Sequence, residues 1–326
     1  MAQESYLYHC FPRRGANTSA EIDKGLKILT CIRDFGLLLL PESIEWSQPV
    51  TDHPPRTFPL IQTRVCFTDL NPAELSEHAA RFGHFAIEFE AESARRLGAI
   101  PVFYVPQRDG GVGTSLLAVL LDARAVIDRA KITHDILNHA AERVALTVSF
   151  TRNPQDKKAF DIHRDESKVL LGALNHQVTP WPMLSNGMDA LLNFFYPADN
   201  TIHDKPLQYY QQREWRIACN FAIDGVEVLR KPTEDEVRRI SQIDEQFFLR
   251  PIQTDHGPID PFSCSLIHPG LNGKTILPMA RRVIVPQSAI EATRELLKHV
   301  EGAQRLSPLK CCHESSWCMR ILPMPT

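Results

Sequence analysis

The sequence has no long hydrophobic run and no large excess of charge of either sign. Its longest apolar stretches, Leu37–Leu40 and Ser115–Leu121, are far shorter than the roughly 20 residues that span a bilayer. The 36 Lys and Arg against 39 Asp and Glu exclude the global basic field that nonspecific nucleic-acid binding uses. Residues 1–11 also lack the basic and apolar regions of a signal peptide. We therefore expect a cytoplasmic protein that does not bind a membrane.

Motifs for metal binding and hydrolysis are missing as well. The sequence has no His-Glu-x-x-His pair and no Gly-x-Ser-x-Gly elbow, which argues against a zinc protease and a serine hydrolase. Gly110–Gly113 precedes an apolar run without the Lys-Ser/Thr pair of a phosphate loop, so we interpret it as a turn. One cluster combines Cys311, Cys312, His313 and Cys318, but its spacing lacks the paired Cys-x2-Cys ligands of zinc sites. We expect reduced thiols and no metal.

The sequence does contain an ordered series of strand and helix signals. Short β-rich or apolar runs predict strands at Leu7–Phe11, Leu37–Leu40, Thr63–Thr68, His84–Glu90, Pro101–Val105, Arg213–Phe221 and Ala280–Val285. Helix starts are predicted by the capping patterns of Thr18 with Glu21, Asn71 with Glu74, and Thr233 with Glu236. Further helices are expected over residues 114–130, from Thr133 towards Phe150, and over 288–300. The three prolines of residues 51–59 predict a loop.

These elements predict an α+β fold and not a doubly wound parallel sheet, because strands and helices alternate without regular βαβ spacing. The composition, with 43% hydrophobic and 23% charged residues, is typical of a globular chain with a sizeable core. We expect a core domain formed by residues 1–109 and 201–300 around a central mixed or antiparallel sheet. Residues 110–200 would form a helical insert, and residues 301–326 a C-terminal tail.

The segment Glu214-Trp215-Arg216 is the most distinctive for chemistry. Side chains alternate along a strand, so Glu214 and Arg216 share one face while Trp215, with Ile217, anchors the other face to the core. A neighbouring carboxylate and guanidinium are either an ordinary ion pair or a catalytic carboxylate steered by the arginine. His9, on the first predicted strand, is either a core histidine or a group that binds a ribose or phosphate oxygen.

Several blocks of sequence together resemble one protein family. They are Tyr8-His9, residues 21–36, 65–70, 82–89, 94–105, 213–216 and 282–286. In this order they resemble the AbiGi family of abortive phage-resistance proteins, which are described as antitoxins. The resemblance is best over residues 6–106 and does not extend to the expected insert. It implies a bacterial phage-defence protein that acts without catalysis, by binding a partner toxin or a phage product.

A second resemblance implies an enzyme. An N-terminal Tyr-His followed much later by Glu-x-Arg on a strand is similar to a divergent ADP-ribosyltransferase, in which a histidine, an aromatic residue and a late glutamate share one NAD cleft. It implies that Glu214 and His9 are catalytic and that Tyr104 and Arg216 bind the ligand. Glu214 would hold the ribose 2′-hydroxyl and stabilise the oxocarbenium charge. The protein would then be an ADP-ribosyltransferase or an NAD glycohydrolase, with NAD as its substrate and no other cofactor implied.

Basic doublets are spread through the chain. They are Arg13-Arg14, Arg95-Arg96, Arg238-Arg239 and Arg281-Arg282. Because the formal net charge is -3, we interpret these doublets as solvated surface and not as nucleic-acid contacts. We therefore expect neither a membrane nor a nucleic acid as partner, whereas the AbiGi resemblance implies a protein partner.

Overall fold

The fold is α+β, as predicted from the sequence. A computed structural model describes residues 6–13, 18–50, 53–105, 112–143, 145–151, 157–176, 181–198, 213–219, 222–223, 226–248, 250–254, 257–300, 307–310 and 316–320. The chain divides into two compact units. Unit 1 comprises Met1–Thr114 and Asn193–Thr326, and unit 2 comprises Ser115–Leu192.

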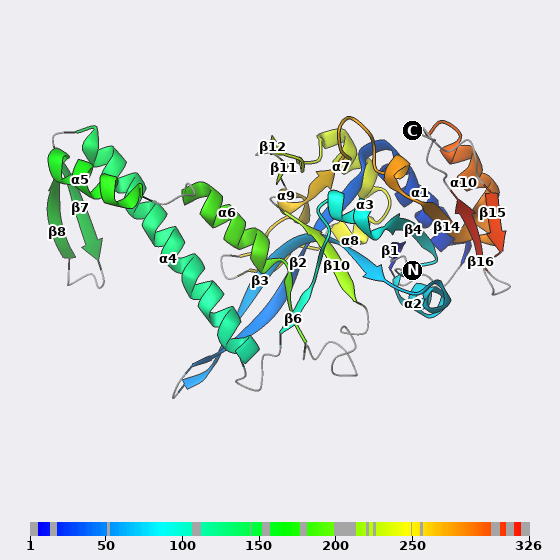
Figure 1. The fold of residues 1–326 in the computed structure, drawn as a ribbon, viewed down its shortest axis with the longest axis horizontal. Coiled ribbons are helices and arrows are strands. Elements are labelled where there is room, and N and C mark those ends of the chain that lie inside the picture. Colours follow the sequence, from blue (N-terminus) through cyan, green and yellow to red (C-terminus); the bar gives the residue numbers. More distant parts are fainter. Residues whose placement is uncertain are drawn as a thin grey trace. The chain divides into compact units, whose positions relative to one another are not determined.

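Unit 1 is built on one large sheet (Figure 1). Its strands are β1 (Tyr6–Phe11), β2 (Leu37–Val50), β3 (His53–Asp69), β4 (Phe85–Glu90), β5 (Ile100–Pro101), β10 (Glu214–Ala218), β13 (Leu266–His268), β14 (Arg282–Pro286), β15 (Ser307–Lys310) and β16 (Ser316–Arg320). They follow the order β13-β2-β3-β1-β4-β14-β16-β15, and β10 pairs with both β3 and β5. The pairs described in this sheet are antiparallel. Strands from both ends of the sequence therefore share one sheet.

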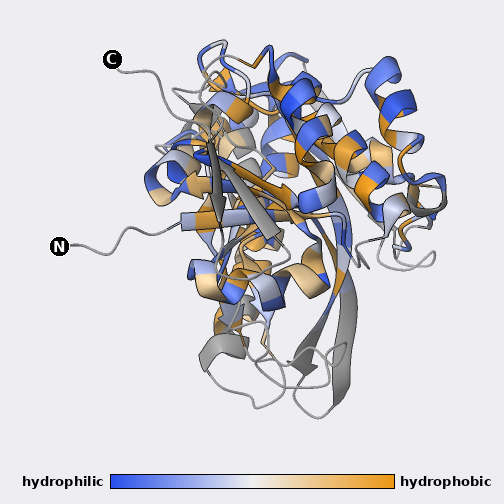
Figure 2. Cartoon of the chain, turned by 90° about the vertical axis from the view of Figure 1, so that its right-hand side faces the viewer, coloured by the Kyte–Doolittle hydropathy of each residue, from blue (hydrophilic) through white to orange (hydrophobic). Residues whose placement is uncertain are grey.

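Helices of unit 1 cover this sheet. They are α1 (Ser19–Phe35), α2 (Leu75–Phe82), α3 (Ala91–Arg96), α7 (Glu234–Ser241), α8 (Glu245–Phe248), α9 (Pro261–Cys264) and α10 (Ile290–Leu297). As predicted, the Thr18 hydroxyl accepts the backbone N–H of Glu21 at the start of α1. The buried side chains of Leu29 and Ile32 on α1 join the main hydrophobic core. Figure 2 shows helices that carry both hydrophobic and hydrophilic residues, as expected for helices with one face on a core.

Both faces of the sheet are covered by packed side chains. One face contributes Leu7, Phe67, Ile87 and Val283 to the main core beneath α1. The other contributes a smaller cluster in which Tyr8, Ala86 and Ile284 pack with Leu70 and Leu75. Alternate residues of β1 thus enter two different clusters, which makes the facing of each β1 side chain unambiguous.

Two short strand pairs accompany the main sheet in unit 1. β6 (Phe103–Val105) and β9 (Phe195–Pro197) run parallel to each other, with Tyr104 opposite Tyr196. β11 (Ala222–Ile223) and β12 (Val226–Glu227) are antiparallel. The β6–β9 pair joins the residues that precede unit 2 to those that follow it.

Unit 2 combines helices with a hairpin. Its elements are α4 (Val112–Ala141), β7 (Ala145–Thr151), β8 (Lys157–His163), α5 (Arg164–Leu174) and α6 (Trp181–Leu192), with α4 beginning just before the unit. The expected second helix from Thr133 towards Phe150 is wrong. The Thr133 hydroxyl donates to the carbonyl of Arg129 within α4 instead of capping a new helix, and Ala145–Thr151 pairs with β8.

The loop predicted for residues 51–59 is also wrong over most of its length. β3 begins at His53, and its pairing with β2 places Pro59 opposite Glu45. Proline is compatible with a strand where its nitrogen points away from the paired neighbour. Gly110 and Gly111 lie outside the residues that the structure describes, as do Cys311, Cys312 and His313. Cys318 of the same predicted cluster lies on β16, opposite Ile284 of β14.

Candidate functional site

The candidate site is built on β10 where this strand pairs with β3. Glu214 lies opposite Thr68, and Arg216 lies opposite Cys66. Residues that oppose each other in an antiparallel pair project from the same face, so these four side chains share one face of the sheet. Trp215 packs against the main hydrophobic core on the other face. The strand alternation predicted from the sequence is therefore present.

Glu214 and Arg216 form a buried ion pair. Nε of Arg216 donates to Oε1 of Glu214 at 2.8 Å, and Nη2 donates to Oε2 at 3.3 Å. Arg216 is 0% exposed and Glu214 is 7% exposed. Burial alone would raise the pKa of Glu214, but the charge and hydrogen bonds of Arg216 lower it to about 2. The carboxylate is thus ionised at neutral pH, and its charge is balanced inside the protein.

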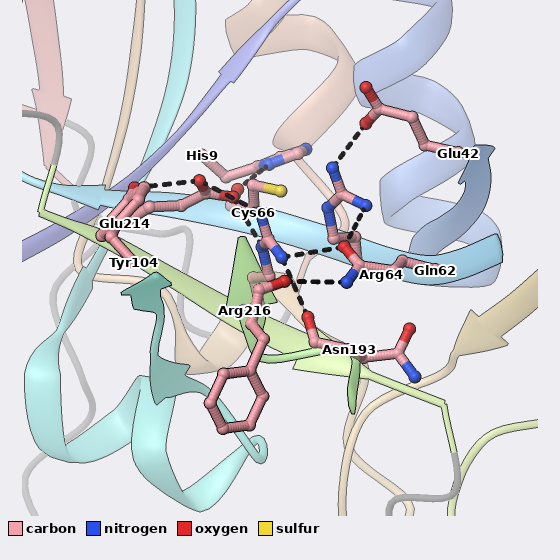
Figure 3. Close-up of polar contacts among 10 residues, drawn as sticks. His9, Glu42, Gln62, Arg64, Cys66, Tyr104, Asn193, Glu214 and Arg216 are labelled. Atoms are coloured by element: carbon pink, nitrogen blue, oxygen red, sulfur yellow. Dashed lines mark hydrogen bonds and ion pairs between the residues drawn. The ribbon is translucent and has the colours of Figure 1, made fainter. Parts of the chain in front are cut away.

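A wider polar network extends from this ion pair (Figure 3). Nη1 of Arg216 donates to Oε1 of Gln62 at 3.1 Å and to the backbone carbonyl of Asn193 at 2.9 Å. Nε2 of Gln62 donates to the backbone carbonyl of Phe195 at 2.8 Å. These bonds connect β3 and β10 to the backbone at the start of β9.

Arg64 brings a second guanidinium group to the same face of β3. Its Nη1 donates to Oε1 of Gln62 at 2.9 Å, and its Nη2 pairs with Glu42 at 2.6 Å. Arg64 and Arg216 lie 5.8 and 5.0 Å from the centre of the Tyr196 ring, within the range of cation–π attraction. Two carboxylates and two guanidinium groups therefore balance one another in this cluster.

Tyr104 also contacts the Glu214 carboxylate. Its hydroxyl donates to Oε2 of Glu214 at 3.2 Å from the neighbouring strand β6. Burial and the nearby charge of Glu214 raise the pKa of Tyr104, so the hydroxyl keeps its proton. Three of the four predicted site residues, Glu214, Arg216 and Tyr104, are thus in direct contact.

His9 lies on the opposite face of the sheet. Tyr8 pairs with Thr68, which also pairs with Glu214, so Tyr8 and Glu214 share a face. The next residue, His9, must then project from the other face, where its ring lies 5.8 Å from that of Phe67. The predicted cleft shared by His9 and Glu214 is therefore wrong, because the sheet separates the two side chains. The separate roles predicted for these residues stay predictions.

Cys66 is a member of the cluster that the sequence prediction missed. Its thiol donates a hydrogen bond to the Glu214 carboxylate. Its backbone carbonyl accepts a hydrogen bond from Nδ1 of His9 at 2.9 Å. Burial and the Glu214 charge raise the pKa of Cys66 to about 11, so the thiol is not a nucleophile at neutral pH. Burial also lowers the pKa of His9, which favours its neutral form.

Gln62 and Arg64 were missed too, although a signal for them exists. Polar or small residues alternate with apolar ones from Arg64 to Phe67, and polar residues precede them at 62 and 63, which is the pattern of a strand with a polar cluster on one face. Asn193 takes part through its backbone carbonyl, for which no side-chain pattern gives a signal. The members of this cluster could not be grouped without the strand register.

Several arginines of the basic doublets are paired within the protein. Arg281 and Arg282 lie 3.6 and 3.2 Å from the buried carboxylate of Glu88. Arg239 pairs with Asp34 at 2.6 Å. These three guanidinium groups therefore have intramolecular anionic partners.

Neither a metal-binding cluster nor a membrane-spanning helix is present among the described residues. Within the described ranges, no group of three or more His, Cys, Asp or Glu side chains could hold a metal ion. The part of the chain that the structure describes also has no helix that is long and apolar enough to cross a membrane.

The comparison with protein families gives one finding. Residues 60–169 match the AbiGi family model. This family is described as "Putative abortive phage resistance protein AbiGi, antitoxin". The match confirms the resemblance predicted from the sequence, and it extends from β3 through α4 into α5, which includes much of the expected insert. Comparisons with curated proteins and with solved structures gave no match.

The AbiGi match covers only part of the polar network. Gln62, Arg64, Cys66 and Tyr104 lie within the matched residues, whereas Glu214 and Arg216 lie beyond them. The match includes the whole of α4 and the hairpin of unit 2.

Proposed function

We propose that this protein acts in phage defence as the antitoxin of an abortive-infection system, by binding a protein partner. The AbiGi match over residues 60–169 is the observation that carries the proposal. The partner is a toxin of the same system or a phage product, and binding restrains its activity. No chemical step by this chain is needed for that function.

The surface of unit 2 supports binding to a protein. Exposed large hydrophobic side chains there are Leu116, Val119, Val126, Ile132, Val169, Leu170, Met183 and Leu191. The larger part of unit 2 also lies within the AbiGi match. Neighbouring exposed apolar side chains are typical of protein-binding surfaces. We infer that α5, where Val169 is 75% and Leu170 49% exposed, contributes to the partner contact.

The state of the polar cluster is consistent with a binding protein. Its ionised carboxylate, Glu214, is paired with Arg216 and accepts a bond from Tyr104. A catalytic carboxylate must instead reach the substrate. The buried pair thus fits a structural role in unit 1.

The proposal is tested by co-expressing the full chain with its candidate toxin. We expect relief of toxicity and a complex of fixed stoichiometry. Replacing Val169 and Leu170 with Asp should weaken the complex at least about tenfold, because two charges would enter an apolar contact. The matched control is Val226→Asp, since Val226 is 69% exposed but belongs to unit 1. Relief of toxicity without any complex would contradict the proposal.

An NAD-consuming enzyme is the second candidate, and the contact between Tyr104 and Glu214 favours it. In this alternative Glu214 would hold the ribose, and Arg216 would bind phosphate or fix the carboxylate. His9 lies on the opposite face of the sheet and would not contact the same substrate. The purified full chain is incubated with NAD, and free nicotinamide is measured. Release that disappears in Glu214→Gln would establish the enzyme. We expect no release, with and without the partner.

A further inference from the structure

One face of α4 repeats apolar and small residues at intervals of three and four. These residues are Leu116, Val119, Ala123, Val126 and Ala130. A helix turns by about 100° per residue, so this spacing places all five on one stripe. We call it the α4 stripe. Alternating intervals of three and four are the spacing by which one helix packs along another.

The large side chains of the α4 stripe are exposed. Leu116 is 48%, Val119 62% and Val126 61% exposed. The same spacing continues to Leu137 and Ala140, which are buried within unit 2 at 3% and 0% exposure. The large side chains of the stripe are therefore exposed, whereas the apolar residues that follow it on α4 are packed within unit 2.

The α4 stripe does not face α6, the neighbouring helix in unit 2. Arg124 of α4 forms an ion pair with Asp189 of α6, so its side of α4 is turned towards α6. At 100° per residue, Arg124 lies about a third of a turn from the centre of the stripe. The exposed side chains of the stripe thus point away from this contact.

Opposite charges flank the stripe at equivalent places. Asp122 precedes Ala123, and Arg129 precedes Ala130, seven residues or one repeat later. Both charged side chains are exposed. When two such helices pair antiparallel, equivalent flanking positions of the two chains face each other. Asp122 would then meet Arg129 of a second copy, and the two-fold axis would create this ion pair twice.

We propose that α4 is a self-association surface, through which two copies of this chain pair their α4 stripes antiparallel. The register that joins Asp122 to Arg129 also places Val119 against Ala130 and Ala123 against Val126 of the second copy. Each layer then combines a large residue with a small one, which permits close contact between helices. A parallel pair would instead place Ala123 against Ala123 and would leave both charges without a charged counterpart.

The interface formed by this stripe is small. Five residues over about four helical turns bury less than the roughly 1,600 Å² of a standard stable interface. We therefore expect a reversible dimer with a dissociation constant in the micromolar range. The fraction of dimer should therefore rise with protein concentration.

Sedimentation velocity of the full chain over about 1 to 200 µM tests the proposal. We expect a concentration-dependent monomer–dimer equilibrium that Val126→Asp shifts to monomer. Val169→Asp on α5 is the matched control and should leave the equilibrium unchanged. A chain that stays monomeric over this range, or a dimer insensitive to Val126→Asp, would overturn the proposal.

A charge swap at low salt tests the antiparallel register. Asp122→Arg places like charges opposite Arg129 and should weaken the dimer about tenfold or more. Adding Arg129→Asp restores opposite charges, so the double variant should dimerise as the native chain does. A double variant as weak as the single one would overturn the register. Circular dichroism of each variant confirms that α4 remains folded.

Discussion

Arg216 donates to both carboxylate oxygens of Glu214, which lies two residues earlier on the same strand. The same guanidinium donates to the carbonyl of Asn193, where the chain returns from unit 2. Tyr104, on the strand that leads into unit 2, bonds to the same carboxylate. One ion pair therefore holds to the main sheet two segments of unit 1 that lie on either side of unit 2 in the sequence.

Replacing Arg216 with Met should destabilise unit 1 by about 3–5 kcal/mol, because the Glu214 carboxylate would remain buried without its counter-charge. Urea unfolding followed by circular dichroism measures the change. The control is Arg238→Met, which removes an exposed pair with Asp235 and should cost less than about 1 kcal/mol. The double variant Glu214→Leu/Arg216→Met should recover most of the loss. If it does not, the lost packing of Arg216 and not the unpaired charge is the cause.

Glu214 should make the protein less stable in acid. The folded state lowers its pKa from 4.5 to about 2, so its contribution is complete above about pH 4.5 and disappears as the pH falls towards 2. Glu214→Gln should therefore reduce the dependence of the unfolding free energy on pH in this window. Glu236, whose pKa is also lowered to about 2 through Arg230, gives a matched comparison. An unchanged pH dependence in both Gln variants would refute this account.

His268 should also make the protein less stable in acid, in a pH range above the one in which Glu214 acts. Its Nε2 donates to the carbonyl of Leu97 at 3.0 Å, and its Nδ1 accepts the N–H of Gly270 at 3.2 Å, which fixes one neutral tautomer. Burial lowers its pKa from 6.5 to about 4. The unfolded chain therefore binds a proton more readily, and stability is lost as the pH falls from 6.5 towards 4. Urea midpoints across this window should vary less in His268→Gln.

Gly25 should not tolerate a methyl group. A Cβ at Gly25 of α1 would lie 2.3 Å from a ring carbon of Phe85 on the sheet. Gly25→Ala should therefore destabilise the protein by about 1–3 kcal/mol through overpacking. A Cβ at Gly172 of α5 would instead meet no atom within 4 Å. Gly172→Ala should therefore stabilise its helix by about 0.5–1 kcal/mol. Thermal melts compare the two. Equal changes in melting temperature for the two variants would mean that helix propensity, and not packing against Phe85, determines the effect of Gly25→Ala.

Local signals in the sequence predicted much of unit 1. The cap of α1 at Thr18 and the alternation of Glu214, Trp215 and Arg216 depend on neighbours in sequence, and both are present. The facing of His9 relative to Glu214 depends on which residues pair through β3. A shift of one residue in that pairing would move the His9 side chain to the other face of the sheet. No local sequence pattern could therefore predict on which face it lies.

Two predictions that were based on the preferences of single residues were wrong. Thr133 is typical of a helix start in sequence, yet inside a long helix its hydroxyl bonds to the preceding turn. Prolines likewise predict loops, but β3 contains them in a strand that pairs with β2. In both places tertiary context overrides the preference of single residues.

The parallel pairing of β6 with β9 has a consequence for how this protein can vary. Parallel neighbours cannot be joined by a tight turn, so the chain between Val105 and Phe195 must cross back to the other end of the pair. Any folded segment that spans this return path satisfies the same hydrogen bonds. The junction is therefore a point at which the segment between the two strands can differ in length and fold while the pairing of β6 with β9 is kept.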